Sequence, residues 1–332
     1  MCYYSSNYTR VVLTHYGGFM NWTKSEVERI DNLLSSTPFN EAVRIAAKET
    51  RRSESSVRYM AKRRAYFSKQ AGFLDKKVDD FGKVVGLFDL HYGKDENGNN
   101  IHLPLEPMLT FLGDYKPDVL VLGGDNLDMA CISHWLKQNL LRQRDLPLLK
   151  DYYNDYNRDV SRPLRQSVGP KCKIVFLGGN HDWAWVERYI EENPNAEGFV
   201  NLEKNIEEVD EFIPYQMDRF YKIGRLFYHH GFRRNKYHAA LTAIESLRAV
   251  RYGHLHSLQA YTQSSNIDIE DYHIAISCPC WCNRAEGYAR NRPNAHVNGF
   301  QVGYVEKDGS FEDYIVVMNK HWFRAEGKNY KV

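Results

Sequence analysis

Short apolar runs recur along the chain from about residue 82, and turn residues bound each of them. Continuous runs of this length are typical of strands that are buried on both faces. Helical segments separate the early runs, notably 133–167, whereas the later runs follow one another closely. The pattern therefore predicts a mixed α/β fold over 80–325, with a β-sandwich flanked by helices. The predicted strands are 84–88, 119–122, 174–177, 226–228, 249–250, 274–276, 302–305 and 315–317, with a hairpin turn at 307–310.

The N-terminal part differs, because its apolar residues follow helical spacing. Residues 1–21 lack periodicity and are expected to form an arm. Over 22–70, a capping box at 23–26 begins a first helix, a second helix is expected over 40–49, and Ser53 is placed to cap a third. Three short helices with a basic last one are typical of a helix-turn-helix module, which inserts its last helix into the major groove of DNA. A small helical bundle with a solvated basic face is the alternative.

Positive charge is concentrated in this N-terminal module. The whole chain has 44 Lys and Arg against 42 Asp and Glu, a balance that neither requires nor excludes a nucleic-acid partner. Residues 43–69 instead hold nine basic residues against two acidic ones, and a local excess of this kind favours a polyanion such as DNA. The residues predicted to contact DNA are Arg52, Arg58, Lys62 and Arg63.

Length and hydropathy limit the class of protein. A chain of 332 residues corresponds to about two domains. No apolar run approaches the roughly 20 residues that span a bilayer, and the first residues lack the basic-then-apolar pattern of a signal peptide. We therefore expect a soluble, cytoplasmic protein without a membrane partner.

Polar residues with metal-binding side chains follow five of the apolar runs, in order along the chain. The run-ending segments are Asp89-Leu90-His91, Gly123-Gly124-Asp125, Gly178-Gly179-Asn180-His181-Asp182, His229-His230-Gly231 and Gly253-His254-Leu255-His256. In an open sheet, ligands bind at the carboxyl ends of the strands, and the neighbouring glycines let the backbone approach closely. Carboxylate, amide and imidazole ligands together suit divalent first-row ions, with Mn²⁺ favoured over Fe, Zn²⁺ or Ni²⁺.

This order of motifs resembles that of the calcineurin-like metallophosphoesterase superfamily, and the resemblance covers about residues 82–320. It implies a binuclear centre in which Asp89, His91, Asp125 and His256 hold one ion. The second ion would be held by Asn180, His230 and His254, with Asp125 bridging the two. His230 is preferred to His229 because the family's histidine directly precedes the glycine.

The resemblance also implies a mechanism. Two ions about 3.5–4 Å apart clamp the phosphoryl oxygens and activate a water, and the resulting hydroxide attacks phosphorus. His181 matches the family's histidine that protonates the leaving oxygen, and Asp128 matches the residue that orients this histidine. Beside the site, Arg233 and Lys236 are predicted to bind the substrate phosphate, with a solvated helix start as the alternative. His134 is predicted to line the leaving-group side, with a packed loop as the alternative.

The substrate is the least constrained part of the sequence interpretation. Protein phosphatases of this superfamily carry an arginine and a glycine directly after the residue matching Asp128, whereas this chain has Met129 and Ala130. The catalytic half looks instead like phage and bacterial members of the DNA-repair type. The favoured function is a nuclease or phosphodiesterase acting on DNA. The alternatives are a phosphomonoesterase or small-molecule phosphodiesterase with a targeting or oligomerising arm, and a non-catalytic DNA-binding regulator.

Three of the six cysteines form the run Cys278-Pro279-Cys280-Trp281-Cys282. The alternate spacing is too close for a zinc knuckle, and no second pair accompanies it at zinc-finger spacing. We expect reduced thiols packed beside a strand end, with metal binding or redox chemistry as the alternatives.

Overall fold

The computed structural model describes residues 25–26, 29–30, 32–33, 37, 39–54, 56–57, 82–94, 100–132, 149–264, 272–283, 295–320 and 322–331. The chain divides into two compact units, Met1–Lys77 and Val78–Val332. Within the described ranges, every helix is too short or too polar to cross a bilayer.

The N-terminal unit contains the helix α2, Phe39–Thr50, which covers the helix expected over 40–49. Small and aliphatic side chains form its core: Ile30, Leu33, Ala42, Val43, Ala46, Ala47 and Val57. The Ser53 hydroxyl accepts the backbone N–H of Ser56 at 3.3 Å, as expected for a helix cap. The predicted arm 1–21 and the predicted DNA contacts Arg58, Lys62 and Arg63 lie outside the described residues.

The larger unit is built on a six-stranded mixed sheet with the order β11-β10-β1-β2-β3-β4. Its centre is parallel, because β1, β2, β3 and β4 all run in the same direction. β10 pairs with β1 and with β11 in antiparallel fashion. The strands are β1 Gly82–Leu87, β2 Val119–Gly123, β3 Lys173–Leu177, β4 Glu211–Ile213, β10 Gly299–Val305 and β11 Phe311–Val317.

A second mixed sheet has five strands in the order β5-β6-β7-β9-β8. β6, β7 and β9 are parallel, and β5 and β8 pair antiparallel at the edges. A separate antiparallel pair joins β12 and β13. These strands are β5 Tyr221–Ile223, β6 Leu226–His229, β7 Ala249–Tyr252, β8 Gln259–Ser264, β9 Tyr272–Ser277, β12 Trp322–Ala325 and β13 Lys328–Lys331.

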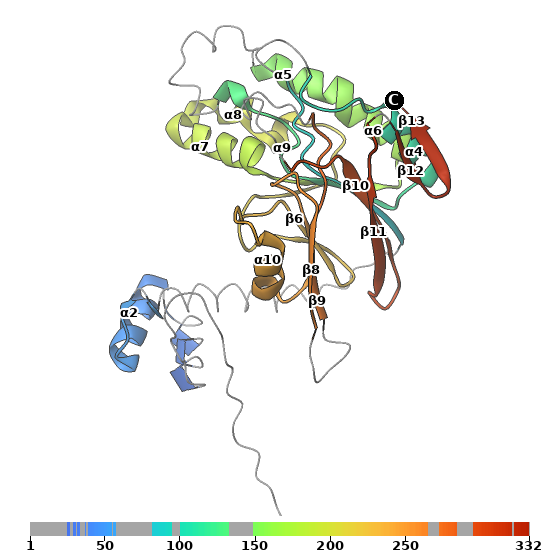
Figure 1. Cartoon of the computed structure of the whole chain (residues 1–332). Helices are drawn as coiled ribbons and strands as arrows, with labels where there is room; N and C mark the ends of the chain where they lie inside the picture. Colours follow the sequence, from blue (N-terminus) through green and yellow to red (C-terminus); the bar gives the residue numbers. More distant parts are fainter. Residues whose placement is uncertain are drawn as a thin grey trace, which may run out of the picture. The chain divides into compact units, whose positions relative to one another are not determined.

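The two large sheets share a buried core, to which Val84 and Val121 of the first sheet and Ile223 and Tyr228 of the second contribute. Alternate residues of a strand face opposite sides of the sheet. Val85 of β1 therefore faces away from this shared core and packs, on the outer face of the first sheet, in a second cluster with residues of the helices. The helices with residues in that cluster are α4 Glu106–Tyr115, α5 Leu149–Tyr156, α6 Arg162–Val168, α7 Trp185–Glu192, α8 Glu197–Val200 and α9 Leu202–Asn205. On the second sheet, α10 (His238–Ser246, orange) packs against β8 and β9 (Figure 1).

The fold class is mixed α/β, as predicted, and each predicted strand overlaps an observed one. The predicted turn 307–310 joins β10 to β11, with the Gly309 N–H donating to the Glu306 carbonyl at 2.9 Å. Of the helical segment expected over 133–167, residues 133–148 lie outside the described part. The remainder forms α5, the π-helical turn Asn157–Ser161 and α6.

Candidate metal centre

All seven predicted metal ligands follow the carboxyl ends of parallel strands. Asp89 and His91 follow β1, Asp125 follows β2, Asn180 follows β3, His230 follows β6, and His254 and His256 follow β7. Ligand atoms from the two sheets lie within contact distance of one another, so these strand ends meet at one edge of the two sheets.

The backbone at this edge is unusual. Asp89, His91, Asp125, His254 and His256 all have positive φ, between 47° and 77°. A side chain other than glycine rarely adopts this conformation, and it costs about 1–3 kcal/mol at each position, so it persists only where the surroundings enforce it. Backbone strain is concentrated in these five residues. This is expected at a functional site, where the position of the side chains is maintained at a cost in local stability.

Glycines beside the ligands are required for close packing. A Cβ atom added to Gly179 would collide with the Asp125 carboxylate, and one added to Gly253 would collide with the Asp89 carboxylate. The Gly-Asn and Gly-His pairs of the sequence therefore bring neighbouring strand ends within contact distance.

A first group of ligand atoms comes from Asp89, His91 and His256, which are all buried. The Nε2 atoms of His91 and His256 lie 3.2 Å apart, and His256 Nε2 lies 3.5 Å from Asp89 Oδ1. These atoms, all within 4.8 Å of one another, could hold a metal ion.

A second group comes from Asp125, His230 and His254. His230 Nε2 lies 3.1 Å from Asp125 Oδ2 and 3.2 Å from the amide oxygen of Asn180. Asp125 also reaches the first group, because its Oδ2 lies 3.8 Å from His91 Nε2. The Asp125 carboxylate therefore lies between the two groups, where a bridging ligand would be placed.

The hydrogen bonds around the imidazoles fit this interpretation. His230 Nδ1 lies 3.1 Å from the Gly123 carbonyl and donates to it, which leaves Nε2, facing Asn180 and Asp125, as the ring nitrogen that a metal ion would bind. His254 Nδ1 is buried and has no hydrogen-bond partner among the described residues. A buried nitrogen without a partner is costly, so the described residues leave this ring incompletely satisfied.

Charge in the pocket also favours cations. Burial lowers the pKa of His91 well below its usual value and that of His254 to about 4, so both rings are neutral, which is the form that binds metals. Burial also acts to lower the pKa of His230, but the charge and hydrogen bond of Asp125, with the charges of Asp89 and Asp182, together outweigh it and raise that pKa to about 9. The buried carboxylates thus create a field that stabilises positive charge.

His181, the predicted proton donor, lies beside these groups. Its Nδ1 lies 2.9 Å from Asp128 Oδ1, and its backbone N–H donates to Asp125 Oδ1 at 2.7 Å. Burial lowers the pKa of His181, but the charges of Asp125 and Asp128 overcome this and raise it to about 9. This shift favours the protonated ring, which is the form that a general acid needs.

Asp182 is a part of the site to which the sequence interpretation gave no role. Its buried carboxylate accepts the backbone N–H groups of Asn126 at 2.8 Å and Gly179 at 2.6 Å, which ties the loop after β2 to the loop after β3. Burial and the charge of Asp125 raise the pKa of Asp182 to about 6. The Asn-His-Asp run was the available signal, but only the folded structure shows which loops Asp182 joins.

The residues predicted to contact substrate or DNA have other partners in the structure or lie outside the described residues. Arg233 pairs with Glu245 of α10, with Nε 2.9 Å from Oε2, and Lys236 lies 5.5 Å from the ring of Tyr237. The neighbouring cation, Arg234, donates instead to Nε2 of His254 at 3.1 Å. Arg52 forms a two-point ion pair with Glu26, and His134 lies outside the described residues.

No protein-family model matches the chain, and no curated protein matches it significantly.

Proposed function

We propose that this protein is a metal-dependent phosphoric ester hydrolase with a binuclear centre of the calcineurin-like type. The observation that carries the proposal is the position of Asp125 between two groups of ligand atoms, 3.1 Å from His230 Nε2 and 3.8 Å from His91 Nε2. Bridging carboxylates between two ions are the arrangement that phosphoryl transfer uses.

The donor set fits two divalent ions. Asp89, His91, Asp125 and His256 would hold one, and Asp125, Asn180, His230 and His254 the other. Oxygen and imidazole nitrogen together suit Mn²⁺, Fe, Zn²⁺ or Ni²⁺. Ions bound there would act as Lewis acids that activate water and neutralise charge on the phosphoryl oxygens.

The chain's own residues supply the remaining functions. The raised pKa of His181 favours its protonated form and Asp128 holds the ring, so His181 can give its proton to the oxygen of the leaving group. Arg234 is exposed beside His254, and its guanidinium can bind a phosphate oxygen that enters the site.

For the substrate, we propose a phosphodiester, with DNA favoured by the basic segment 43–69. Met129 is fully buried in the core on the helical side. That residue occupies the position at which protein phosphatases place a phosphate-gripping arginine, and its burial supports a different substrate class. A phosphomonoester is the alternative.

The test is hydrolysis by metal-free protein to which Mn²⁺ is returned, with a bis-aryl phosphate, an aryl monophosphate and DNA assayed in parallel. Activity should depend on the returned metal, and Asp125→Asn should abolish it on every substrate. Asp114→Asn is the matched control, because Asp114 is a half-exposed carboxylate that pairs with Lys328. Metal-independent hydrolysis, or full activity in Asp125→Asn, would falsify the proposal.

A further inference from the structure

The cysteine run after β9 forms a buried segment in which alternate residues face opposite sides. Trp281 is fully buried in the core on the helical side, against Phe300 and Phe323. Its neighbours Cys280 and Cys282 are also fully buried. In an extended chain, residues on either side of a buried anchor point the other way, so both thiols face the same side.

Backbone hydrogen bonds fix this segment against the loop that carries His256. The Trp281 N–H donates to the Phe88 carbonyl at 2.9 Å, and the Cys280 N–H donates to the Val297 carbonyl at 3.0 Å. The Val297 N–H in turn donates to the His256 carbonyl at 2.7 Å. The thiols and the imidazole are therefore positioned by main-chain contacts.

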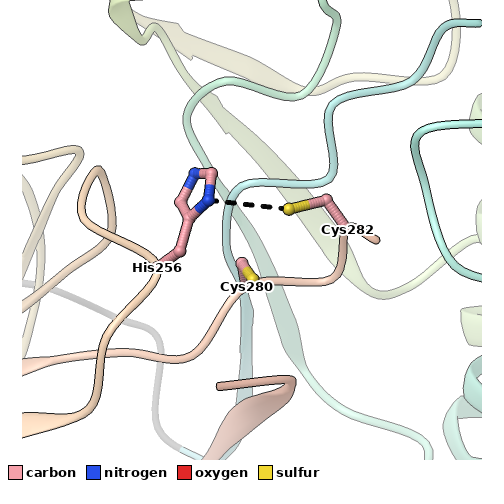
Figure 2. Close-up of side chains that lie close together, drawn as sticks. All are labelled: His256, Cys280 and Cys282. Carbon is pink, nitrogen blue, oxygen red and sulfur yellow. Dashed lines mark hydrogen bonds between the residues drawn. The ribbon is translucent and has the colours of Figure 1, made fainter. Parts of the chain in front are cut away.

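Both thiols lie close to the ring of His256, and the Cys282 thiol faces its Nδ1 (Figure 2). Its Nδ1 lies 3.7 Å from Cys282 Sγ, and the ligand atoms of His256, Cys280 and Cys282 all lie within 4.8 Å of one another. The other ring nitrogen, Nε2, faces His91 and Asp89 of the binuclear site. One imidazole thus lies between two separate ligand clusters.

We propose that His256, Cys280 and Cys282 form a third cation site, which binds a soft or borderline ion such as Zn²⁺ or Cu⁺. Two sulfurs and one nitrogen without a carboxylate select such ions over Mn²⁺. The site goes beyond the proposed hydrolase function, because none of its sulfurs belongs to the hydrolytic groups. Binding releases the thiol protons, and a ring bound through both nitrogens also gives up its N–H proton to solvent.

The shared ring couples this site to the hydrolytic centre. An ion on Nδ1 changes the basicity of Nε2, so occupancy of the thiolate site alters metal affinity at the group of Asp89 and His91. A soft ion would in this way regulate the hydrolase from inside the core.

The experiment is titration of the reduced, metal-free full chain with Cd²⁺, recording thiolate-to-metal charge-transfer absorption and the bound equivalents by native mass spectrometry. The wild-type chain should show one equivalent that carries the absorption. Cys280→Ser and Cys282→Ser should each lose it. Cys278→Ser is the matched control and should retain it, since Cys278 is equally buried but does not belong to the group of ligand atoms around His256.

Asp125→Asn separates this proposal from the hydrolase proposal, because it disrupts the binuclear centre and leaves the thiolate absorption intact. Absence of the absorption in the wild-type chain overturns the third site, as does its persistence in both Cys280→Ser and Cys282→Ser. Cys280→Ala and Cys282→Ala, which place no polar atom in the core, replace either serine variant that does not fold, and the same loss is expected.

Discussion

The imidazole of His181 and the carboxylate of Asp128 lie 2.9 Å apart, although 53 residues separate them in the sequence. Parallel pairing of β2 with β3 places the loops after these strands side by side. The buried carboxylate of Asp182 then ties the two loops together through the N–H groups of Asn126 and Gly179. The orientation of the His181 ring therefore depends on the pairing of β2 with β3 and on the contacts of Asp182 between their loops.

His181→Ala should retain the metal ions and lose hydrolytic rate by about 10²–10⁴-fold. The loss should be largest for alkyl esters, because an aryl leaving group needs less protonation. Asp128→Asn should give a smaller loss of the same kind, and the double variant should be no slower than His181→Ala, since both residues act through one proton. Steady-state rates with elemental analysis provide the check. Additive losses would show that Asp128 acts independently of the ring.

His230 and His229 are adjacent, yet they have different surroundings. His230 Nε2 faces Asp125 and Asn180, whereas His229 Nδ1 accepts the N–H of Gly231 and its ring packs on Phe232. His230→Ala should therefore lose one of the two bound ions and all hydrolysis. His229→Gln should keep both ions and lose only stability. Metal stoichiometry by elemental analysis distinguishes them, and the reverse result would exchange their roles.

Arg234 and Arg233 provide a second neighbouring pair. Arg234→Gln should lower kcat/KM by about tenfold or more, because a charge-assisted hydrogen bond of about 1.5–3 kcal/mol to the phosphate is lost. Arg233→Gln removes a partly exposed pair with Glu245, which is worth only about 0–1 kcal/mol of folding stability, and should leave kcat/KM unchanged. If the Arg233 variant loses the activity instead, the earlier assignment from sequence gains support.

The arginine pair shows where sequence reasoning reaches its limit. Strand ends were predictable, because a buried apolar run followed by Asp or His places that side chain at a sheet edge. The segment that contains Arg233 and Arg234 lies beyond the apolar run of β6 and has no regular alternation of apolar and polar residues. Nothing in the sequence therefore distinguishes Arg233 from Arg234. Their assignment depends on Glu245, which lies twelve residues away on α10.

Five observed strands were not predicted from the sequence, namely β4, β5, β8, β12 and β13, because they too lack a clear local signal. β4 and β5 each contain only three residues, and the exposed β8 is mostly polar, so none forms a clear apolar run. The hairpin of β12 and β13 turns at Glu326 and Gly327, which both have positive φ. Asn-Gly or Asp-Gly is the usual signal for such a turn, and Glu-Gly does not stand out.

A buried ion pair connects the two sheets. Arg251 of β7 binds Asp313 of β11 through two contacts of 2.5 and 2.6 Å, and the two side chains are 1% and 5% exposed. Asp313→Ala should lower the free energy of unfolding by about 3–5 kcal/mol, because it leaves a buried guanidinium unpaired. The double replacement Arg251→Met with Asp313→Leu should recover most of that loss. Urea denaturation measures both, and a loss below 1 kcal/mol in Asp313→Ala would contradict this account.

The DNA prediction concerns the basic residues Arg58, Lys62 and Arg63. If they contact phosphates, replacing all three with Gln should weaken DNA binding and reduce the slope of log affinity against log salt by about 2.7. DNA cleavage should fall, whereas hydrolysis of an aryl phosphate should not change, because the metal ligands are intact. Lys116, Lys307 and Lys320 are exposed cations of the larger unit, and their triple Gln variant is the matched control. Equal loss of both activities would mean that residues 58–63 support folding. An unchanged salt slope would favour the phosphomonoesterase alternative, because a small substrate needs no contact with this segment.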